Sequence, residues 1–339
     1  MRAFRRRAGA GMAALAALSL VASACGGSSS STSSSGGSPS SASSGGSSSG
    51  GSIAKQYHLA GAHFAVGSKE FTEENILGEM TVDALKAAGG TATFQALTGS
   101  TTTRTALTSG RIDMYWEYDG TAWLDYLQHT APIASAQGQY QAVANQDMSQ
   151  NHIKWLAPTP FSDGYGVAVR SKAPGALGKL DTDSQLASYV KANPNQSTFC
   201  GASEFHNRSD GLPALEKTYG FTFPSGNIKT VDLSLDYTSV AKGNPCNLAE
   251  IFTTDGRIQA LNLKVLNDDK TAFGNYQASL TVRNAVYSKY PSQLSGIFDA
   301  ISAKLTTPVI QNLNKEVDVD GMTASAVAAT WLHQNGFTG

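Results

Sequence analysis

The chain has 339 residues, a formal net charge of −1 and 15% charged residues. This balance gives no reason to expect a nucleic-acid partner or a polybasic contact with a membrane surface. The roughly 280 residues that follow the first 60 are enough for two lobes of typical domain size.

Residues 1–25 have the pattern of a targeting segment. Arginines at positions 2, 5, 6 and 7 precede a short apolar run over 8–21, and small residues at 22–24 lead into Cys25. The run is shorter than the roughly 20 residues that a membrane-spanning helix needs. A cysteine in this position resembles a bacterial lipobox, so we expect Cys25 to be lipidated. An ordinary secretory signal with an incidental cysteine is the alternative.

A long run of Ser and Gly follows Cys25. Such a composition cannot bury apolar area, and we expect a disordered tether over 26–60. Together with a lipid on Cys25, the tether would keep a globular domain attached to the membrane. The expected localisation is therefore extracytoplasmic, as a lipoprotein anchored to the cell membrane.

Two further cysteines, Cys200 and Cys246, lie in the part of the chain that should fold. A secretory signal places them in an oxidising compartment, where an even pair favours a disulfide. Two free buried thiols are the alternative.

The first predicted element after the tether is a strand over 64–66. A polar turn over 67–69 follows it, and Thr72 stands at the expected N-cap of a helix. A strand that leads through a polar turn into a helix N-terminus is how open α/β folds build small-molecule sites. Lys69 would stand at the mouth of such a site.

The rest of the chain alternates between strand and helix patterns. We expect strands at 91–97, 112–118, 153–157, 165–170, 197–200, 227–231, 248–252 and 278–282. We expect helices before Gly110 and at 121–127, 183–191, 213–219, 234–242, 286–290, 293–305, 309–317 and 324–335. The alternation indicates an α/β fold with a mainly parallel sheet. Two such series and a returning helical tail predict two lobes with a cleft between them.

Signatures of catalysis are few. The sequence has no HExxH, no Walker-type loop and no GxGxxG after a strand, and its six histidines lack metal-ligand spacing. We therefore expect no enzyme, no catalytic residues, no metal and no cofactor. A surface-anchored hydrolase would need a nucleophile or metal set, and an adhesion or scaffold protein is a third alternative.

Four tyrosines stand near turns, at strand edges or on a short helix: Tyr118, Tyr165, Tyr237 and Tyr276. Several aromatic faces around a pocket attract a quaternary ammonium group, because the face of each ring carries negative charge. Any one of them could instead be core or surface filler.

Two cations could hold the other end of a ligand. Lys69 and Arg208 are each suited to a carboxylate, Arg208 through a bidentate fork. Either could equally be a surface residue or an internal ion-pair partner. We expect Asp255 and Arg257 to brace the crossover between the lobes rather than to touch ligand.

Six segments in order resemble one family. They are GSKEFTEENILGEM (67–80), IDMYWEYDGTAW (112–123), YGVAVR (165–170), RSDGLPALEKTYGF (208–221), FTTDGRIQALNLKVLNDDK (252–270) and LNKEVDVDG (313–321). They are similar to segments of the substrate-binding proteins of bacterial ABC importers for quaternary amines, which take up glycine betaine, proline betaine, carnitine and choline. The resemblance runs from about residue 61 to 336.

The resemblance implies a two-lobed periplasmic-binding fold of type II that closes on its ligand. Lobe 1 would comprise 61–163 and 274–339, and lobe 2 would comprise 164–273. The four tyrosines named above would form an aromatic cage, and Lys69, Thr121 and Arg208 would hold the polar end of the ligand. The expected partners are an ABC permease and its ATPase, and the expected state is a monomer.

One position departs from the family pattern. The segment that commonly reads EYTGT has Asp119 in place of the first Thr. Facing the pocket, Asp119 would repel the carboxylate of glycine betaine and tolerate the hydroxyl of choline. Paired with Lys69, it would cancel one carboxylate anchor. Both routes favour choline, provided that the side chain points inward. Asp119 could also simply cap the turn before Gly120. A bulkier betaine such as carnitine or ergothioneine is the alternative ligand.

Overall fold

The computed structural model describes residues 51–339. The expected signal segment, the expected lipidation site Cys25 and most of the expected tether lie outside the described residues. Within 51–339, no helix is both long enough and apolar enough to cross a membrane.

The tether expected over 26–60 does not extend to residue 60. Helix α1 (Ser52–Gln56) begins at residue 52, and Ile53 and Leu59 are each 1% exposed. The N–H group of Ser52 donates to the carbonyl of Gly336 at 2.9 Å. Ile53 and Leu59 supply apolar area to bury as soon as the Ser/Gly run ends, so the chain is ordered there.

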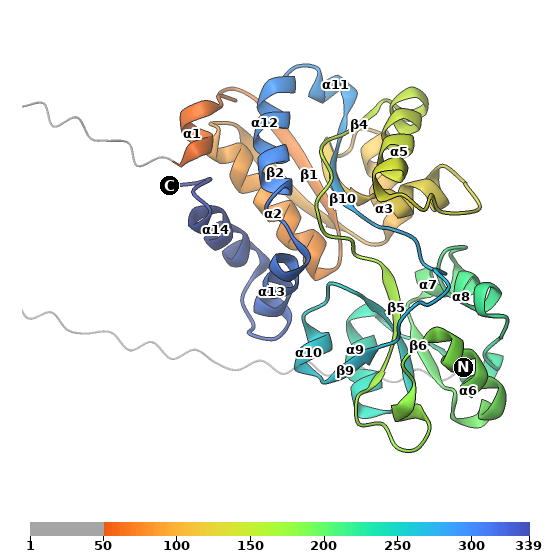
Figure 1. The fold of residues 1–339 in the computed structure, drawn as a ribbon. Helices are drawn as coiled ribbons and strands as arrows, with labels where there is room; N and C mark the ends of the chain where they lie inside the picture. The colour runs from red at the N-terminus through yellow and green to blue at the C-terminus, as the bar shows by residue number, and fades with distance from the viewer. Residues whose placement is uncertain (1–50) are drawn as a thin grey trace, which may run out of the picture. The chain divides into compact units, whose positions relative to one another are not determined.

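The described chain forms two five-stranded sheets, one in each of two lobes (Figure 1). The strands of the first sheet are β1 (His63–Lys69), β2 (Thr91–Leu97), β3 (Met114–Tyr118), β4 (Ile153–Trp155) and β10 (Ala278–Arg283). Their order in the sheet is β2-β1-β3-β10-β4. The strands of the second sheet are β5 (Tyr165–Arg170), β6 (Phe199–Gly201), β7 (Ile228–Thr230), β8 (Leu248–Phe252) and β9 (Leu263–Val265). Their order is β7-β6-β8-β5-β9.

Both sheets are mixed, and each is mainly parallel as expected, because four of its five strands run in one direction and the fifth runs against them. Strand β1 pairs in parallel with β2 and β3, and β6 pairs in parallel with β7 and β8. Strand β10 is antiparallel to β3 and β4, and β5 is antiparallel to β8 and β9. Each of these two strands follows a crossing from the other sheet, at 156–164 and 266–277, and enters its own sheet in the opposite direction. The strands fall within the expected lobe ranges, whose limits stay a prediction.

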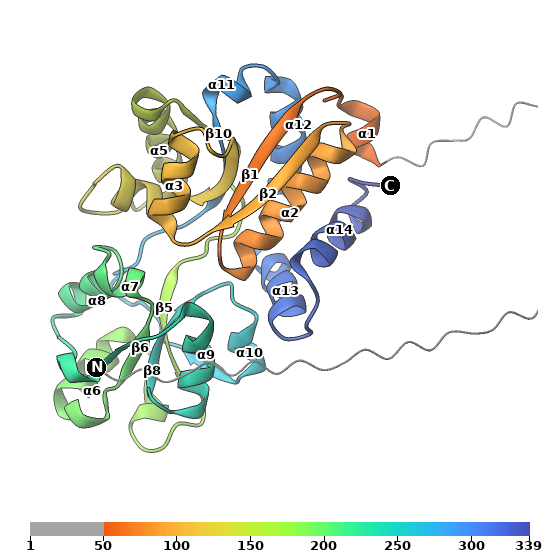
Figure 2. The same ribbon diagram turned by 180° about the vertical axis from the view of Figure 1, so that it is seen from behind.

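Helices cover both faces of the first sheet (Figures 1 and 2). One side carries α2 (Thr72–Ala87), α12 (Pro291–Ser302), α13 (Thr307–Asp318) and α14 (Ala324–Gln334), with the short α11 (Asn284–Tyr287) before α12. The other side carries α3 (Ser100–Thr108) and α5 (Ala136–Asn151). Alternate residues of β3 point to opposite faces, so Met114 and Trp116 pack in the core with α2, while Tyr115 packs in a second core with α3 and α5.

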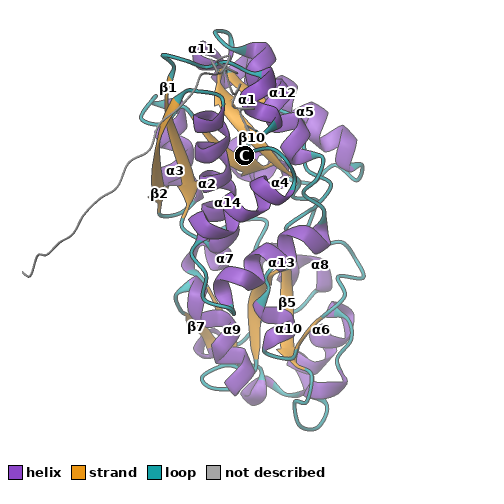
Figure 3. Ribbon diagram, turned by 90° about the vertical axis from the view of Figure 1, so that its left-hand side faces the viewer, coloured by secondary structure: helices purple, strands orange, loops and turns teal. Residues whose placement is uncertain are grey.

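The second sheet is covered in the same way (Figure 3). Helices α6 (Asp183–Ala192) and α8 (Leu212–Tyr219) pack with Val167 and Val169 of β5, and α9 (Leu233–Lys242) packs with Ala168. The short helices α7 (Ser203–Asn207) and α10 (Arg257–Ala260) follow β6 and β8. Cys200 of β6 and Cys246 form the expected disulfide, with Cα atoms 5.6 Å apart.

The helix after β1 starts differently from the expectation. The residue at the N-cap of α2 is Phe71 rather than Thr72, and it makes no side-chain capping bond. The hydroxyl of Thr72 donates instead to Asp318 at 2.6 Å. The hydroxyl of Thr72 is therefore not available to cap α2, and Phe71 occupies the N-cap position in the turn.

Candidate functional site

A cavity of about 380 Å³ lies between the two lobes. Its lining from lobe 1 is Lys69, Glu70, Phe71, Thr98, Gly99, Ser100, Tyr118, Thr121 and Tyr276. Its lining from lobe 2 and the crossing segment is Asp163, Tyr165, Ala202, Ser203, Glu204, Arg208, Val231, Asp232, Leu233, Glu250 and Phe252. The carboxyl ends of β1, β3 and β8 open onto this space, which is where open α/β sheets bind ligands.

The structure brings six of the expected site residues to this cavity: Lys69, Tyr118, Thr121, Tyr165, Arg208 and Tyr276. Lys69 and Tyr118 end β1 and β3, and Tyr165 begins β5. Thr121 lies on the single turn α4 (Asp119–Thr121), which continues into a π-helical turn over Ala122–Tyr126.

Gly120 allows the turn α4 to pack closely against Asn275 and Tyr276. A Cβ atom at Gly120 would lie 2.4 Å from the carbonyl oxygen of Asn275 and 2.6 Å from the ring of Tyr276. Glycine is therefore required for the Tyr276 ring and the Asn275 carbonyl to approach this turn so closely.

Five aromatic rings make the apolar wall of the cavity. The rings of Phe71 and Phe252 stack with centroids 5.2 Å apart, and Tyr165 stacks on Phe252 at 5.4 Å. Tyr276 meets Tyr165 edge to face at 5.9 Å, and Tyr118 lies 6.2 Å from Phe71. We call these five residues the aromatic wall. Its two phenylalanines were not singled out from the sequence, although each stands just beyond or at the end of a strand, as the tyrosines do.

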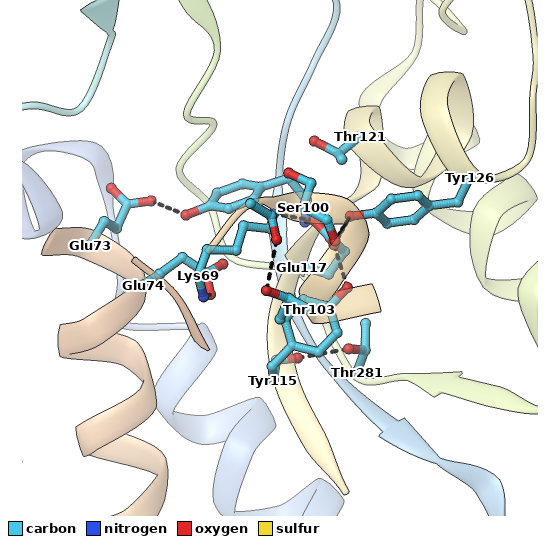
Figure 4. Close-up of polar contacts among 12 residues, drawn as sticks. Lys69, Glu73, Glu74, Ser100, Thr103, Tyr115, Glu117, Thr121, Tyr126 and Thr281 are labelled. Atoms are coloured by element: carbon cyan, nitrogen blue, oxygen red, sulfur yellow. Dashed lines mark hydrogen bonds and ion pairs between the residues drawn. The ribbon is translucent and has the colours of Figure 1, made fainter. Parts of the chain in front are cut away.

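Lys69 is paired inside the protein. Its Nζ atom donates to Oε1 of Glu117 at 2.6 Å, and neither residue is more than 4% exposed. The same carboxylate accepts hydrogen bonds from the hydroxyls of Tyr115 and Tyr126 (Figure 4). Burial alone would lower the pKa of Lys69, but the charges of Glu117 and Glu74 raise it above its ordinary value. The lysine is therefore a cation whose charge is already balanced.

The charge of Arg208 is also balanced by internal carboxylates. Its Nε and Nη2 atoms donate to the two oxygens of Asp210 at 2.9 and 2.6 Å, and Nη1 donates to Glu204 at 2.9 Å. Nη2 also reaches the hydroxyl of Thr121 at 3.3 Å, across the cavity in lobe 1. The hydroxyl of Tyr276 donates to Asp210 at 2.8 Å, which fixes one ring of the aromatic wall to the same cluster.

The hydroxyl of Tyr118 fixes a second ring. It donates to Glu73 at 2.6 Å, and this buried carboxylate also accepts from Thr254 at 2.6 Å and Asn314 at 3.1 Å. Glu73 belongs to α2 in lobe 1, whereas Thr254 lies two residues after β8 in lobe 2. Burial raises the pKa of Glu73, and its three hydrogen bonds lower it in part.

Tyr237 does not belong to the cavity. Its side chain is fully buried in lobe 2, and its hydroxyl accepts the N–H of Phe252 at 2.9 Å. The guanidinium of Arg257 lies 3.9 Å from the centre of its ring. The expected cage position at Tyr237 is therefore corrected: the residue supports the strand that carries Phe252. Arg257 is itself paired with Asp255, and the role expected for these two residues in bracing the crossover between the lobes stays a prediction.

Asp119 neither lines the cavity nor pairs with Lys69. Its side chain is fully buried, and Oδ1 accepts the amide of Gln139 at 3.1 Å and the N–H of Gln277 at 3.0 Å. Burial raises the pKa of Asp119 to about 7, although these hydrogen bonds lower it in part. Both expected routes from Asp119 to the choice of ligand are wrong, because the side chain binds Gln139 of α5 and Gln277, the residue before β10.

Among residues 51–339, no group of three or more His, Cys, Asp or Glu side chains is arranged to hold a metal ion. The site thus consists of an aromatic wall and two cations that internal carboxylates balance. The carboxylates Glu117, Glu204 and Asp210 had no distinguishing pattern in the sequence.

Comparisons with known proteins agree on one family. A family profile described as the substrate binding domain of an ABC-type glycine betaine transport system matches residues 63–334. A glycine-betaine-binding protein of Pseudomonas aeruginosa is 34% identical over 274 residues, 80% of this chain and 87% of that protein. The glycine betaine-binding protein YehZ of Escherichia coli is 31% identical over 287 residues, 82% and 92% of the two chains.

A solved structure described as a glycine betaine/carnitine/choline ABC transporter superposes with a TM-score of 0.65 at 26% identity. The likeness covers 81% of this chain and 99% of that one. It agrees with the expected two-lobed periplasmic-binding fold of type II.

Proposed function

The chain belongs to the family of substrate-binding domains of ABC-type glycine betaine transport systems, and on that premise we propose how it binds its ligand. It is an extracytoplasmic solute-binding protein of an ABC importer and not an enzyme. We propose that it captures a quaternary ammonium compound of the choline or glycine betaine class in the cavity between its lobes. Delivery to an ABC permease and its ATPase, from a lipid anchor on Cys25, completes the proposal.

The aromatic wall is the observation that carries this proposal. Five rings from both lobes face one cavity of about 380 Å³, and the two neighbouring cations are each paired with carboxylates. A trimethylammonium group has no N–H to donate, so it is held by the faces of aromatic rings rather than by hydrogen bonds. Balanced cations at the other end remove the repulsion that a cationic group would otherwise meet.

Contacts across the cavity couple binding to closure. Glu204 and Arg208 of lobe 2 reach Ser100 and Thr121 of lobe 1. Thr254 of lobe 2 donates to Glu73 of lobe 1. A ligand that fills the space between the lobes adds contacts to both of them, so it favours the closed arrangement that a permease would recognise.

Isothermal titration tests the proposal with choline, glycine betaine, carnitine and ergothioneine as ligands. We expect binding of at least one trimethylammonium compound in the micromolar range. Tyr165→Leu should weaken it about tenfold or more, because a desolvated cation–π contact is lost. Tyr287→Leu is the matched control: Tyr287 lies on α11, outside the cavity lining and without contact to the aromatic wall, so its loss should leave the affinity unchanged.

The absence of heat with all four ligands would refute the proposal. So would equal losses of affinity in Tyr165→Leu and Tyr287→Leu, in proteins that circular dichroism shows to be folded. Preferential binding of carnitine or ergothioneine would assign the bulkier betaine as the ligand, within the same class of function.

A further inference from the structure

Three hydrogen-bond donors from two lobes converge on the carboxylate of Glu204. Its Oε1 atom accepts the hydroxyl of Ser100 at 2.6 Å and Nη1 of Arg208 at 2.9 Å. Its Oε2 atom accepts the backbone N–H of Ser100 at 3.2 Å. Ser100 is the first residue of α3 in lobe 1, whereas Glu204 and Arg208 belong to lobe 2.

These donors are the kind that a ligand carboxylate uses. A guanidinium gives charge-assisted hydrogen bonds, and a backbone N–H at a helix N-terminus favours an anion. Ser100 and Arg208 both line the cavity, and Glu204 lines it beside them. The protein therefore places one of its own carboxylates on the donors that the carboxylate of a betaine would need.

No other cation at the cavity is left for a ligand carboxylate. The remaining N–H groups of Arg208 donate to both oxygens of Asp210, and Lys69 donates to Glu117. The two cations thus donate to three carboxylates, those of Glu117, Glu204 and Asp210. Burial alone would raise the pKa of Glu204, but the hydrogen bond from Ser100 and the charge of Arg208 bring it below its ordinary value. Glu204 is therefore ionised at neutral pH.

We propose that Glu204 is a specificity-determining residue that occupies the anion-binding donors of the cavity and selects a quaternary ammonium ligand without a carboxylate over a zwitterionic betaine. The inference rests on the proposed function and narrows its ligand class. A hydroxyl at the far end of such a ligand can donate to Glu204, whereas a carboxylate there would be repelled by it and would have to displace it.

The test is the ratio of two affinities, measured by isothermal titration with choline chloride and glycine betaine. Wild-type protein should bind choline more tightly. In Glu204→Gln and Glu204→Ala, we expect the ratio of betaine affinity to choline affinity to rise about tenfold or more, since Arg208 and Ser100 become free to hold the betaine carboxylate. A ratio of affinities cancels any loss of lobe closure that weakens both ligands alike.

Asp125→Asn is the matched control. Asp125 lies outside the cavity lining and within the field of Arg208, but it accepts no hydrogen bond from it. The control should leave the ratio near its wild-type value. An equal rise in Asp125→Asn would reduce the effect to general charge and overturn the assignment of Glu204.

Tighter binding of glycine betaine than of choline by the wild-type protein, or an unchanged ratio in both Glu204 variants, would also overturn the inference. In those cases a trimethylammonium ligand still binds, so the proposed function stands. If neither choline nor any betaine binds the wild-type protein, the proposed function fails and this inference fails with it.

Discussion

Lys69 and Glu117 form a buried ion pair, and the carboxylate of Glu117 also accepts hydrogen bonds from three other donors. Besides Nζ of Lys69, it accepts the hydroxyls of Tyr115 and Tyr126 and the N–H of Tyr118. A carboxylate with no exposed surface is tolerated only while its charge is matched. The pair therefore fixes the end of β3, where the aromatic wall begins.

Removing one partner should be costly. In Lys69→Met the Glu117 charge is left buried and unmatched, and we expect a loss of about 3–5 kcal/mol in the free energy of unfolding. The double variant Lys69→Met/Glu117→Gln should recover much of that loss. Urea denaturation of the two single variants, the double variant and the wild type measures the coupling. Losses that simply add would show that the two charges do not depend on each other.

The sequence places a residue near a turn but does not say which way it points. Tyr165 and Tyr237 have similar surroundings in the sequence, yet the first begins β5 at the cavity and the second is buried on α9 behind β8. Asp119 looked like a departure within the site for the same reason, and it points into the protein. The role of Glu204 depends on Ser100, a residue of the other lobe, and no local pattern records such a contact.

Among the elements, helix α5 has no counterpart in the sequence prediction. Its sequence, AQGQYQAVANQDMSQN, lacks an apolar stripe because its buried face is largely polar. Gln139 holds Asp119 at 3.1 Å, and Asp147 accepts from Arg104 at 3.0 Å and from the indole of Trp155 at 2.8 Å. Hydrogen bonds replace apolar contacts here, so periodicity could not reveal the helix. Most strands have short apolar or β-branched patterns, and these were predicted to within a few residues.

The disulfide is an element of lobe 2 alone. It joins β6 to the residue two positions before β8, across a sequence separation of 46 residues. The chain-entropy model gives about 4 kcal/mol for a loop of this length. We expect Cys200→Ser/Cys246→Ser to lower the free energy of unfolding by about that amount. Urea denaturation of wild type and variant, each with and without a thiol reductant, is the measurement. An effect of reductant on the variant would indicate a cause other than this bond.

For the whole molecule, buried carboxyl groups determine how the free energy of unfolding depends on pH. Burial raises the pKa of Glu74 and Asp236 to about 8 and that of Asp119 and Asp183 to about 7, with smaller contributions from neighbouring charges or hydrogen bonds. In the unfolded chain these groups lose their protons near pH 4. Between pH 4 and 8 the folded state therefore holds more protons than the unfolded state, and its stability falls as pH rises.

We expect the free energy of unfolding to be higher at pH 5.5 than at pH 8. Each such group contributes up to about 1.4 kcal/mol per pH unit within its window. Asp236→Asn should make stability fall less steeply with pH, because it removes one of these titrating carboxyl groups. The substitution breaks no hydrogen bond, since neither carboxylate oxygen of Asp236 has a partner among the described residues. Denaturation at several pH values, with the exposed Asp320→Asn as control, measures the slope. A wild-type stability that increases from pH 5.5 to pH 8 would contradict the assignment.

The two-lobed arrangement and the mainly parallel sheets could be anticipated from the order of the elements, whereas the one antiparallel strand in each sheet could not. Strand direction depends on where the chain crosses between lobes, at 156–164 and 266–277, and both crossings are made by segments without regular structure. The lobe contacts at Glu204 and Glu73 likewise join residues far apart in the sequence.

The hydrogen bonds of α1 have a consequence for engineering. Ser52 and Ile53 donate their N–H groups to Gly336 and Phe337 at 2.9 and 3.1 Å, so the beginning and end of the described chain meet on lobe 1 (Figure 1). A short peptide could join residue 339 to residue 51, and the ring could be opened at Gly226 of lobe 2, where an added Cβ would touch nothing within 4 Å. The resulting circular permutant would have its new termini, and a fluorescent reporter fused to them, on lobe 2. The peptide that joins the original termini would lie on lobe 1.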